Sequence, residues 1–254
     1  KTAVSLRLSR IILTSFVILL NIAAISSAVS ITWSNGAIPV DGDWNNGANW
    51  VLGVKPDAVD DWAKINMAAG PVFSTGRTAT TYRVYLEGTN GTITMNGGTL
   101  NTNNHIYVAA AATDTATLNM NSGDVNIVGT FYVALNTGGV ADVNLSGGTI
   151  TCGVLFMRAS GGTGTINITS TGTLIINNTG ATNVNTYITN GWIKAYNGIG
   201  TVIVDVNNIN PDKTTVWASA PTKAGLPSPA DDAANVITLT DLSWIGMPGA
   251  TSRD

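Results

Sequence analysis

The residues of this 254-residue chain that could do chemistry are few. His105 is its single histidine and Cys152 its single cysteine, so the sequence offers no histidine-rich metal site, no recognisable catalytic triad and no internal disulfide. His105 begins a predicted strand, where we expect a solvent-exposed strand end. Cys152 follows the inward-facing Ile150 by two residues, so we expect it to act as a small apolar core side chain.

The strongest metal candidate is an aspartate-rich stretch near the N-terminus. Asp41-Gly42-Asp43-Trp44-Asn45 carries the first three ligand positions of a calcium loop, but Asn46 stands where glycine is required and Leu52 where the bidentate glutamate belongs. Asp57 and the Asp60-Asp61 pair could contribute to a different calcium site. We favour an Asx-rich turn, and predict no metal and no other cofactor.

Catalysis on polysaccharides would need clustered carboxylates with Lys or Arg on one outer face. The charged side chains of the central region are scattered over different predicted strands and corners: Glu87, Asp114, Asp124, Asp142 and Arg158. The sequence therefore predicts that the chain is not an enzyme.

A repeat positions the remaining candidates. Ile93–Leu100 recurs as Leu118–Val125 and as Val143–Ile150, and the anchoring glycines Gly98, Gly123, Gly148 and Gly172 are 25, 25 and 24 residues apart. A fixed period in the twenties, filled with short β-type segments and Gly/Asn/Ser/Thr corners, is typical of a stacked solenoid.

Each period contains three short strands. No ten-residue segment inside a period shows a helical spacing of apolar residues, which argues against a leucine-rich repeat with helices. We predict an all-β fold, a right-handed parallel β-helix with a Trp-rich N-terminal cap. Its core should be lined by alternate residues of the first two strands, namely Ile93, Met95, Leu118, Met120, Val143 and Leu145 from the first and Leu100, Val125 and Ile150 from the second.

The third strand of each period differs, because it is apolar at both alternating positions, as in a sheet that is covered on both faces. If Ile106, Phe131 and Leu155 point inward, the aromatic residues beside them form an outward ladder. We expect this ladder to be a binding surface for self-association or for an extracellular glycan. The alternative is that residues 209–245 fold back and cover it. The predicted surface consists of Tyr85, Tyr107, Tyr132, Phe156 and Tyr187.

The predicted domain order starts with a secretory signal at residues 1–28. Lys1, Arg7 and Arg10 precede an apolar run, Ile11–Ile25, that is shorter than the roughly 20 residues of a membrane-spanning helix, and Ser26–Ala28 suits cleavage. We therefore expect a secreted or cell-surface protein with no stable membrane span after signal removal. A cap at residues 29–80, β-helix repeats at 81–209 and a C-terminal segment at 210–254 follow.

The bulk composition narrows the class of partner. Charged residues make up only 11% of the chain, and a net charge of −3 with no basic stretch argues against nucleic acid as a partner. Four of the seven tryptophans, Trp33, Trp44, Trp50 and Trp62, lie in the predicted cap, where large aromatic side chains can close the end of a solenoid core. A sugar-stacking site is the alternative interpretation of these tryptophans.

The Trp-rich opening, followed by Gly-Gly-Thr-Leu/Ile and Tyr-Val-Ala rungs, resembles secreted parallel β-helix proteins of planctomycete-type bacteria, similar to autotransporter-associated strand repeats. Gly191–Thr201 resembles the closing turn of such arrays. Leu226–Asp231, with Leu242–Trp244 and Gly249–Ser252, resembles the first two strands of a fibronectin-III-like module. A complete module needs several more strands, so we expect either a truncated module within residues 210–254 or pairing of these residues elsewhere. The resemblance implies an architecture and carries over no catalytic residue.

Two functions remain open. The first is a structural or adhesive segment of an extracellular or cell-surface protein, able to self-assemble. The second is a carbohydrate-active module that binds a glycan or, as the less favoured version, cleaves one as a polysaccharide lyase or hydrolase.

Overall fold

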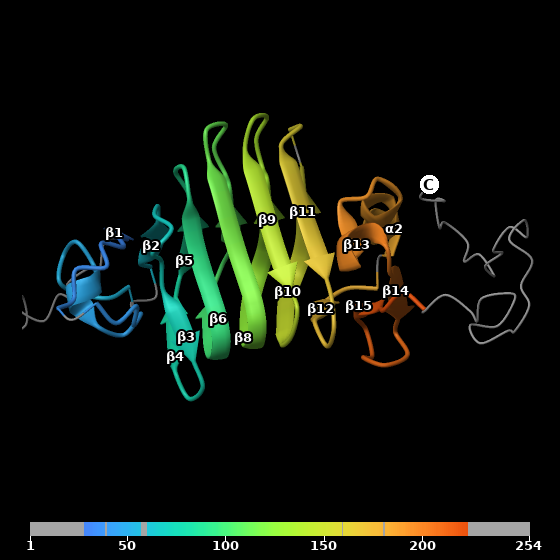
Figure 1. Ribbon diagram of the computed structural model, residues 1–254, viewed down its shortest axis with the longest axis horizontal. Helices are drawn as coiled ribbons and strands as arrows, with labels where there is room; N and C mark the ends of the chain where they lie inside the picture. Colours follow the sequence, from blue (N-terminus) through green and yellow to red (C-terminus); the bar gives the residue numbers. More distant parts are fainter. Residues whose placement is uncertain (1–27, 39, 57–59, 159, 180, 223–254) are drawn as a thin grey trace, which may run out of the picture.

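The computed structural model describes residues 28–38, 40–56, 60–158, 160–179 and 181–222. They form a parallel β-solenoid of about five turns, as predicted. Its strands run across the long axis of the molecule and are stacked along it (Figure 1). Each turn runs through three sheets, because the chain bends at glycine-containing corners after the first and second strands. The predicted signal at residues 1–28 and the fibronectin-III-like motifs after residue 222 lie outside these ranges, apart from Ala28.

The first sheet carries the strand that opens each turn. All of its neighbours are parallel, in the register that the repeat predicts. Its strands are, in spatial order, β3 (Val72–Ser74), the start of β6 (Gly91–Thr102), the start of β8 (Thr115–Val133), β9 (Val140–Leu145), β11 (Thr163–Ile168) and β13 (Ile193–Ala195).

The second sheet follows the first corner and is parallel until its last two strands, which are antiparallel to their neighbours. It consists of β4 (Thr78–Thr81), the end of β6, the middle of β8, the start of β10 (Thr149–Met157), β12 (Thr173–Ile176), β15 (Thr214–Ser219) and β14 (Thr201–Val206).

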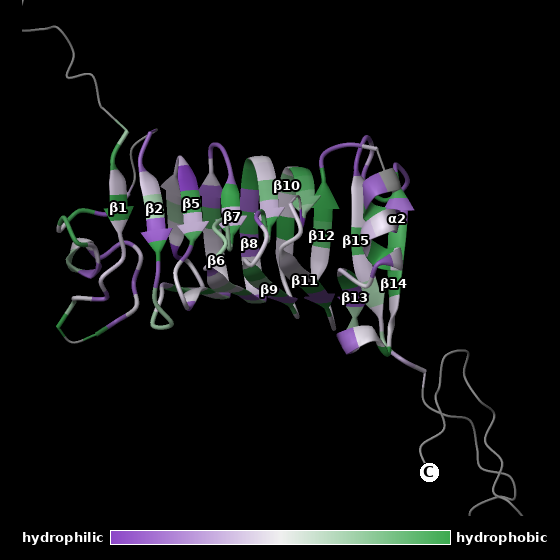
Figure 2. Cartoon of the chain, turned by 90° about the horizontal axis from the view of Figure 1, so that it is seen from above, coloured by the Kyte–Doolittle hydropathy of each residue, from purple (hydrophilic) through white to green (hydrophobic). Residues whose placement is uncertain are grey.

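The third sheet closes each turn, and Figure 2 shows its first strands in order along the axis. It consists of β1 (Ser30–Thr32), β2 (Trp62–Ile65), β5 (Arg83–Leu86), β7 (Ile106–Val108) and the ends of β8 and β10.

The corners between the first and second sheets depend on glycine. Gly98, Gly123 and Gly148 have φ angles of 68°, 87° and 73°, which residues with a side chain rarely adopt. A Cβ at Gly123 would also lie 2.5 Å from the carbonyl carbon of Gly97 in the turn below. Gly172 has no such φ angle, but a Cβ there would collide with the Leu145 carbonyl oxygen, so the close stacking of turns alone requires glycine.

The predicted core register is confirmed. The apolar side chains of the first two strands that were expected to point inward are at most 1% exposed: Ile93, Met95, Leu100, Leu118, Met120, Val125, Val143, Leu145 and Ile150. Their alternation with Thr and Asn side chains, which stay partly or fully exposed, is the reason that the segments form strands with one dry and one wet face.

Tryptophan closes the N-terminal end of this core, as predicted. Trp33 and Trp44 pack edge-on against Trp50, with ring centroids 5.0 and 4.8 Å apart, and all three are almost completely buried. The short 3-10 helix η1 (Gly47–Asn49) holds them, because its buried Asn49 accepts from the Ala37 N–H and donates to the Asp43 carbonyl. Parallel pairing already begins with β1 and β2, so the stacked turns extend into the range 29–80 that was predicted as cap.

The C-terminal end is closed differently. After β12 the chain forms α2 (Ala181–Thr189) in place of another third-sheet strand, then β13, the 3-10 helix η2 (Tyr196–Gly198) and the β14–β15 hairpin. Since β15 pairs with β12, residues 214–219 belong to the end of the solenoid and not to a separate module starting at 210. No helix within the described ranges is long and apolar enough to cross a membrane.

Candidate interaction surface

The predicted aromatic ladder exists on the outer face of the third sheet, apart from one member. Tyr85, Tyr107, Tyr132 and Phe156 occupy equivalent positions in β5, β7, β8 and β10. The centroids of Tyr85 and Tyr107 are 4.6 Å apart with rings 4° from parallel, and those of Tyr107 and Tyr132 are 4.6 Å apart at 3°. Phe156 is turned by 68° against Tyr132 at 5.9 Å, so the parallel stack ends there. We call these four residues the aromatic ladder.

The sequence places these rings outside because their neighbours along each strand point inward. Ile106, Phe131 and Leu155, which were expected to face the core, are at most 3% exposed. The tyrosines are half-buried, and Phe156 is 40% exposed. No described residue covers the ladder from outside as a further layer: residues 209–222 belong to the β14–β15 turn, β15 and the segment after it, and the rest of the range 209–245 is outside the described residues.

Tyr187 was predicted to extend the ladder, and this prediction is wrong. Tyr187 lies in α2, is 7% exposed and stacks on Trp192 at 5.6 Å, so it helps to close the C-terminal end of the core. The sequence did not identify Trp62 as an aromatic neighbour of the ladder: its ring lies 5.9 Å from that of Tyr85, although it is Lys64 that is in register with Tyr85. The alternation of Trp62-Ala63-Lys64-Ile65 matches that of Arg83–Leu86, and this signal would have placed Trp62 outside.

A second column runs beside the ladder, one alternation earlier on each strand. Trp62 pairs with Arg83 in this column. His105 and Thr130 continue it, because they directly precede Ile106 and Phe131, which pair with each other. Val84, which follows Arg83, pairs with Ile106 in the same way. The Arg83 guanidinium lies 5.2 Å from the ring centroids of both Trp62 and Tyr82, within cation–π range. We call the ladder and this column together the aromatic face.

His105 is not a freely solvated strand end, as the sequence suggested. Its Nδ1 accepts the backbone N–H of Thr130 in the next turn at 2.8 Å, and its ring meets the rings of Tyr107 and Tyr132 at steep angles. Gly129 makes this approach possible, since a Cβ there would lie 2.6 Å from Nδ1. Partial burial, and then the nearby charge of Arg83, lower the pKa of His105 below its ordinary value.

The orientation of the stacked rings determines what this face can bind. Because Tyr107 has a tyrosine parallel to it on both sides, its two ring faces are occupied, and only its ring edges and hydroxyl group are left for other contacts. Burial, followed by the neighbouring Tyr85, raises the pKa of the Tyr107 hydroxyl, which therefore stays a neutral hydrogen-bond donor. Lys64 and Glu87, 3.5 Å apart, form a polar margin beside the ladder. The ladder is thus flat and apolar between its hydroxyl groups, with Lys64 and Glu87 on one side and Arg83 in the column on the other.

The aspartate-rich stretch forms hydrogen-bonded turns, as favoured from the sequence. Asp41 accepts from the side chains of Asn46 and Asn49 and from the backbone N–H of Asp43, while Asp43 pairs with Arg77. The bond from Asn46, then that from the Asp43 backbone and that from Asn49, lower the Asp41 pKa to about 2. Asp57 lies outside the described residues, among which no group of three His, Cys, Asp or Glu side chains is arranged around a common point.

The other candidate residues have structural surroundings. Cys152 is completely buried, and this burial raises the pKa of its thiol to about 12, which fits the inert core role that we expected. Asp114 is also buried and accepts the backbone N–H groups of Gly88 and Ala111. Asp124 and Asp142 are exposed on the second and first sheets, so the structure does not bring the carboxylates together.

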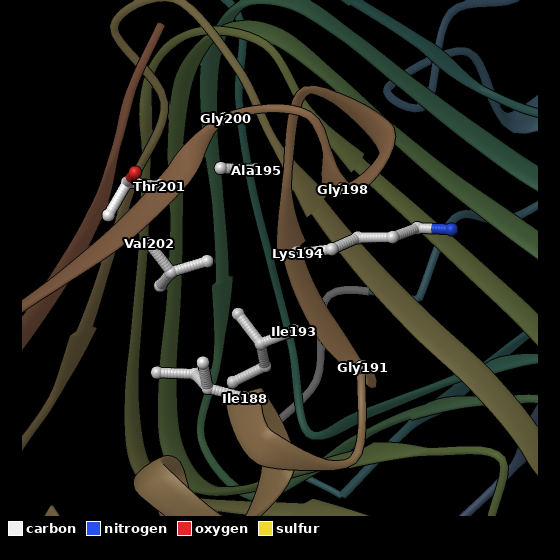
Figure 3. A pocket seen from close by; sticks show the side chains of 9 residues that line it. All are labelled: Ile188, Gly191, Ile193, Lys194, Ala195, Gly198, Gly200, Thr201 and Val202. Atoms are coloured by element: carbon white, nitrogen blue, oxygen red, sulfur yellow. The ribbon is translucent and has the colours of Figure 1, made fainter. Parts of the chain in front are cut away.

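A surface depression of about 370 Å³ lies at the C-terminal end (Figure 3). Ile188, Ile193 and Val202 meet in it, and the Lys194 side chain extends away from them along the outside. It is lined by residues of α2, β13 and β14 and includes none of the four residues of the aromatic ladder. Its lining contains no carboxylate or histidine.

Comparisons of the chain with protein-family models, with curated proteins and with solved structures find no match. The resemblance to secreted β-helix repeats therefore rests on the sequence motifs alone.

Proposed function

We propose that this chain is a structural or adhesive segment of an extracellular protein, and that its aromatic face binds a second copy of the chain side by side. The observation that carries the proposal is the row of half-buried rings from Trp62 to Tyr132 with the exposed Phe156 at its end, which no further layer of described residues covers. A flat apolar stripe of this kind is more than a soluble monomer normally leaves exposed.

The two ends of the solenoid favour a lateral contact over an end-to-end contact. Trp33, Trp44 and Trp50 close one end of the core, and α2 with the β14–β15 hairpin closes the other. Capped solenoids do not add further turns at their ends, so a second copy meets the side of the molecule.

The ring orientation favours protein over glycan as the partner. The C–H groups of a sugar pack on the face of an aromatic ring, and the faces of Tyr107 are occupied by Tyr85 and Tyr132. Ring edges and hydroxyl groups suit packing against another sheet, where they meet apolar side chains and backbone or side-chain acceptors. The predicted signal at residues 1–28 and the resemblance to secreted repeats support the extracellular setting. The proposal assigns no catalytic residue.

The test compares two double variants of the same two turns. Tyr107→Ser with Tyr132→Ser removes the centre of the ladder, and Asn101→Ser with Asn126→Ser changes two outward residues of the second sheet by the same number of substitutions. Sedimentation velocity over a range of concentrations should show self-association that the tyrosine variant loses and the asparagine variant keeps.

Loss of stability must be separated from loss of contact, because the tyrosines also stabilise one another. Phe156→Ser serves this purpose, since Phe156 lies outside the parallel stack and is exposed. It should weaken association while thermal unfolding stays close to that of the unchanged chain. A chain that stays monomeric at every concentration contradicts the proposal, and binding to a panel of polysaccharides that depends on Tyr107 and Tyr132 would replace it with the glycan function.

A further inference from the structure

His105 lies where two turns of the aromatic face meet. It precedes β7, and its imidazole bonds to the turn that follows, at the point where β8 enters the third sheet. Gly129 donates its N–H to the Asn104 carbonyl at 2.7 Å, and Thr130 donates to His105 Nδ1 at 2.8 Å, so the two bonds fix consecutive residues of the next turn. Of these two bonds, only the one from Thr130 to His105 depends on a titratable group.

The bond defines the protonation state of the ring. An imidazole nitrogen that accepts a hydrogen bond carries no proton, so His105 is neutral with its proton on Nε2. Protonation of Nδ1 would point an N–H at the Thr130 N–H, and the bond would be lost. Gly129 fits against Nδ1 with no space for a Cβ, so the ring cannot move closer to the backbone on that side.

The groups around the imidazole disfavour a positive charge. Arg83 is the first residue of β5, the equivalent strand of the turn before, and its charge acts on His105. The rings of Tyr107 and Tyr132 contact the imidazole, at 5.8 and 5.5 Å between centroids. Lys64 and Glu87 pair with each other at the margin of the face, beyond Tyr85 in register. No carboxylate among the described residues is paired with His105 or contributes to its electrostatic surroundings.

We propose that the aromatic face is a pH-sensitive surface, in which neutral His105 holds in place the end of β8 that enters the third sheet, and protonation releases it. The released Thr130 segment carries Tyr132 two residues later, so the Tyr107–Tyr132 stack loosens with it. If the face binds a second copy, as the proposed function states, mild acid should weaken that lateral contact. This consequence rests on the proposed function. The switch itself is a property of the single chain.

The direction follows from the shift of the pKa. In the unfolded chain His105 titrates near its ordinary value of 6.5, and in the folded chain it titrates at lower pH. The contribution of His105 to stability is therefore complete above 6.5 and is lost progressively as the pH falls from 6.5 through the lower folded value. The single histidine makes this window simple to assign, since no other side chain of this chain has an ordinary pKa there.

The experiment follows the Thr130 amide, the tyrosine signals and self-association of the same full chain between about pH 7.5 and about pH 5. In the unchanged chain, the Thr130 amide proton should shift and lose its protection from exchange, after correction for the intrinsic rate. The near-ultraviolet circular dichroism of the tyrosines should fall, and association should weaken, with the midpoint at which the His105 ring resonances titrate.

His105→Asn is the matched control. The Asn side-chain oxygen is bonded to Cγ, as Nδ1 is in histidine, so it can accept the Thr130 N–H and does not titrate. Its tyrosine signal and association should stay constant over the same range. The same pH response in His105→Asn would overturn the inference, and so would a Thr130 amide that keeps its shift and protection while the His105 resonances titrate.

The outcomes separate the two proposals. A chain that is monomeric at neutral pH contradicts the lateral contact, but the Thr130 amide and the tyrosine signal still decide whether the switch exists. A chain that associates equally at both pH values while the amide responds keeps its lateral contact, and it contradicts the link from switch to surface.

Discussion

The outer faces of the second and third sheets are built by consecutive segments of the same turns, yet they differ in chemistry. On the second sheet Asn126 donates its side-chain N–H to Asn101 at 3.0 Å, and the surrounding positions are Thr and Asp. On the third sheet the same two turns stack Tyr107 and Tyr132. Both faces lie over the same core, so the inward residues specify the solenoid and the outward residues are left to specify what the solenoid contacts.

The largest expected effect is the loss of an inward side chain. Leu145→Ala, at a fully buried position in the middle of the stack, should lower the free energy of unfolding by about 2–5 kcal/mol, because parallel turns on both sides prevent the cavity from collapsing. Urea denaturation measures this. The adjacent outward change Asn144→Ala should cost less than about 1 kcal/mol, and equal losses in the two variants would contradict the division between inner and outer positions.

The corner that separates the two sheets should be nearly as sensitive. Gly123→Ala combines a strained φ angle with backbone atoms 2.5 Å from the new Cβ, and we expect a loss of about 2–4 kcal/mol in denaturant unfolding. Gly53→Ala is its control, because Gly53 has a φ angle of 70° and nothing within 4 Å of a Cβ. Gly53→Ala should lose only the cost of placing alanine at a positive φ angle, about 1 kcal/mol of the free energy of unfolding. A similar loss at both sites would mean that the close stacking of the corners does not matter.

A single substitution, Tyr107→Ser, tests how much the outer face of the third sheet contributes to stability. Tyr107→Ser removes two parallel stacks, each worth about 0.5–1.5 kcal/mol, so the free energy of unfolding should fall by about 1–3 kcal/mol. Tyr85→Ser removes one parallel stack and the tilted contact with Trp62, and should cost less. A Tyr107→Ser chain as stable as the original would show that the ladder serves only contacts with other molecules.

The smallest effect belongs to the polar side. Asn126→Ser breaks one exposed side-chain hydrogen bond, and we expect a loss of about 0.5 kcal/mol or less by the same measurement. A loss as large as that of Tyr107→Ser would mean that both outer faces stabilise the solenoid equally, and the contrast between them would disappear.

The sequence allowed much of this architecture to be predicted, because strand alternation and the glycine period are local signals. Core residues such as Met120 and Leu145, and the ladder members Tyr107 and Tyr132, follow from counting along one repeat. The error at Tyr187 arose where the period ends. Val184, Tyr187 and Ile188 have the spacing of a helix face, but the segment was interpreted as a continuation of the strands.

The surroundings of His105 could not be predicted in the same way. Its partner, the Thr130 N–H, is 25 residues away and reaches the ring only because Gly129 allows the backbone to approach. This separation equals the repeat length, so the sequence predicts that His105 and Thr130 lie in neighbouring turns. The alternation of a strand does not specify the side-chain direction of the residue that precedes it, which is the position of His105. Trp62 was grouped with the cap tryptophans for a related reason, since it is the same residue type as the buried ones and differs from them only in register.

The pairing of each turn with its immediate neighbours also has a mechanical consequence. In the body of the solenoid no strand bonds beyond the turn before and the turn after it. A load that pulls on the C-terminal end therefore peels the β14–β15 hairpin from β12 first, and then detaches one turn after another. The chain would lengthen under tension in steps of one repeat and dissipate work at each step. In the structural or adhesive role that we propose, it would act as an extensible tether.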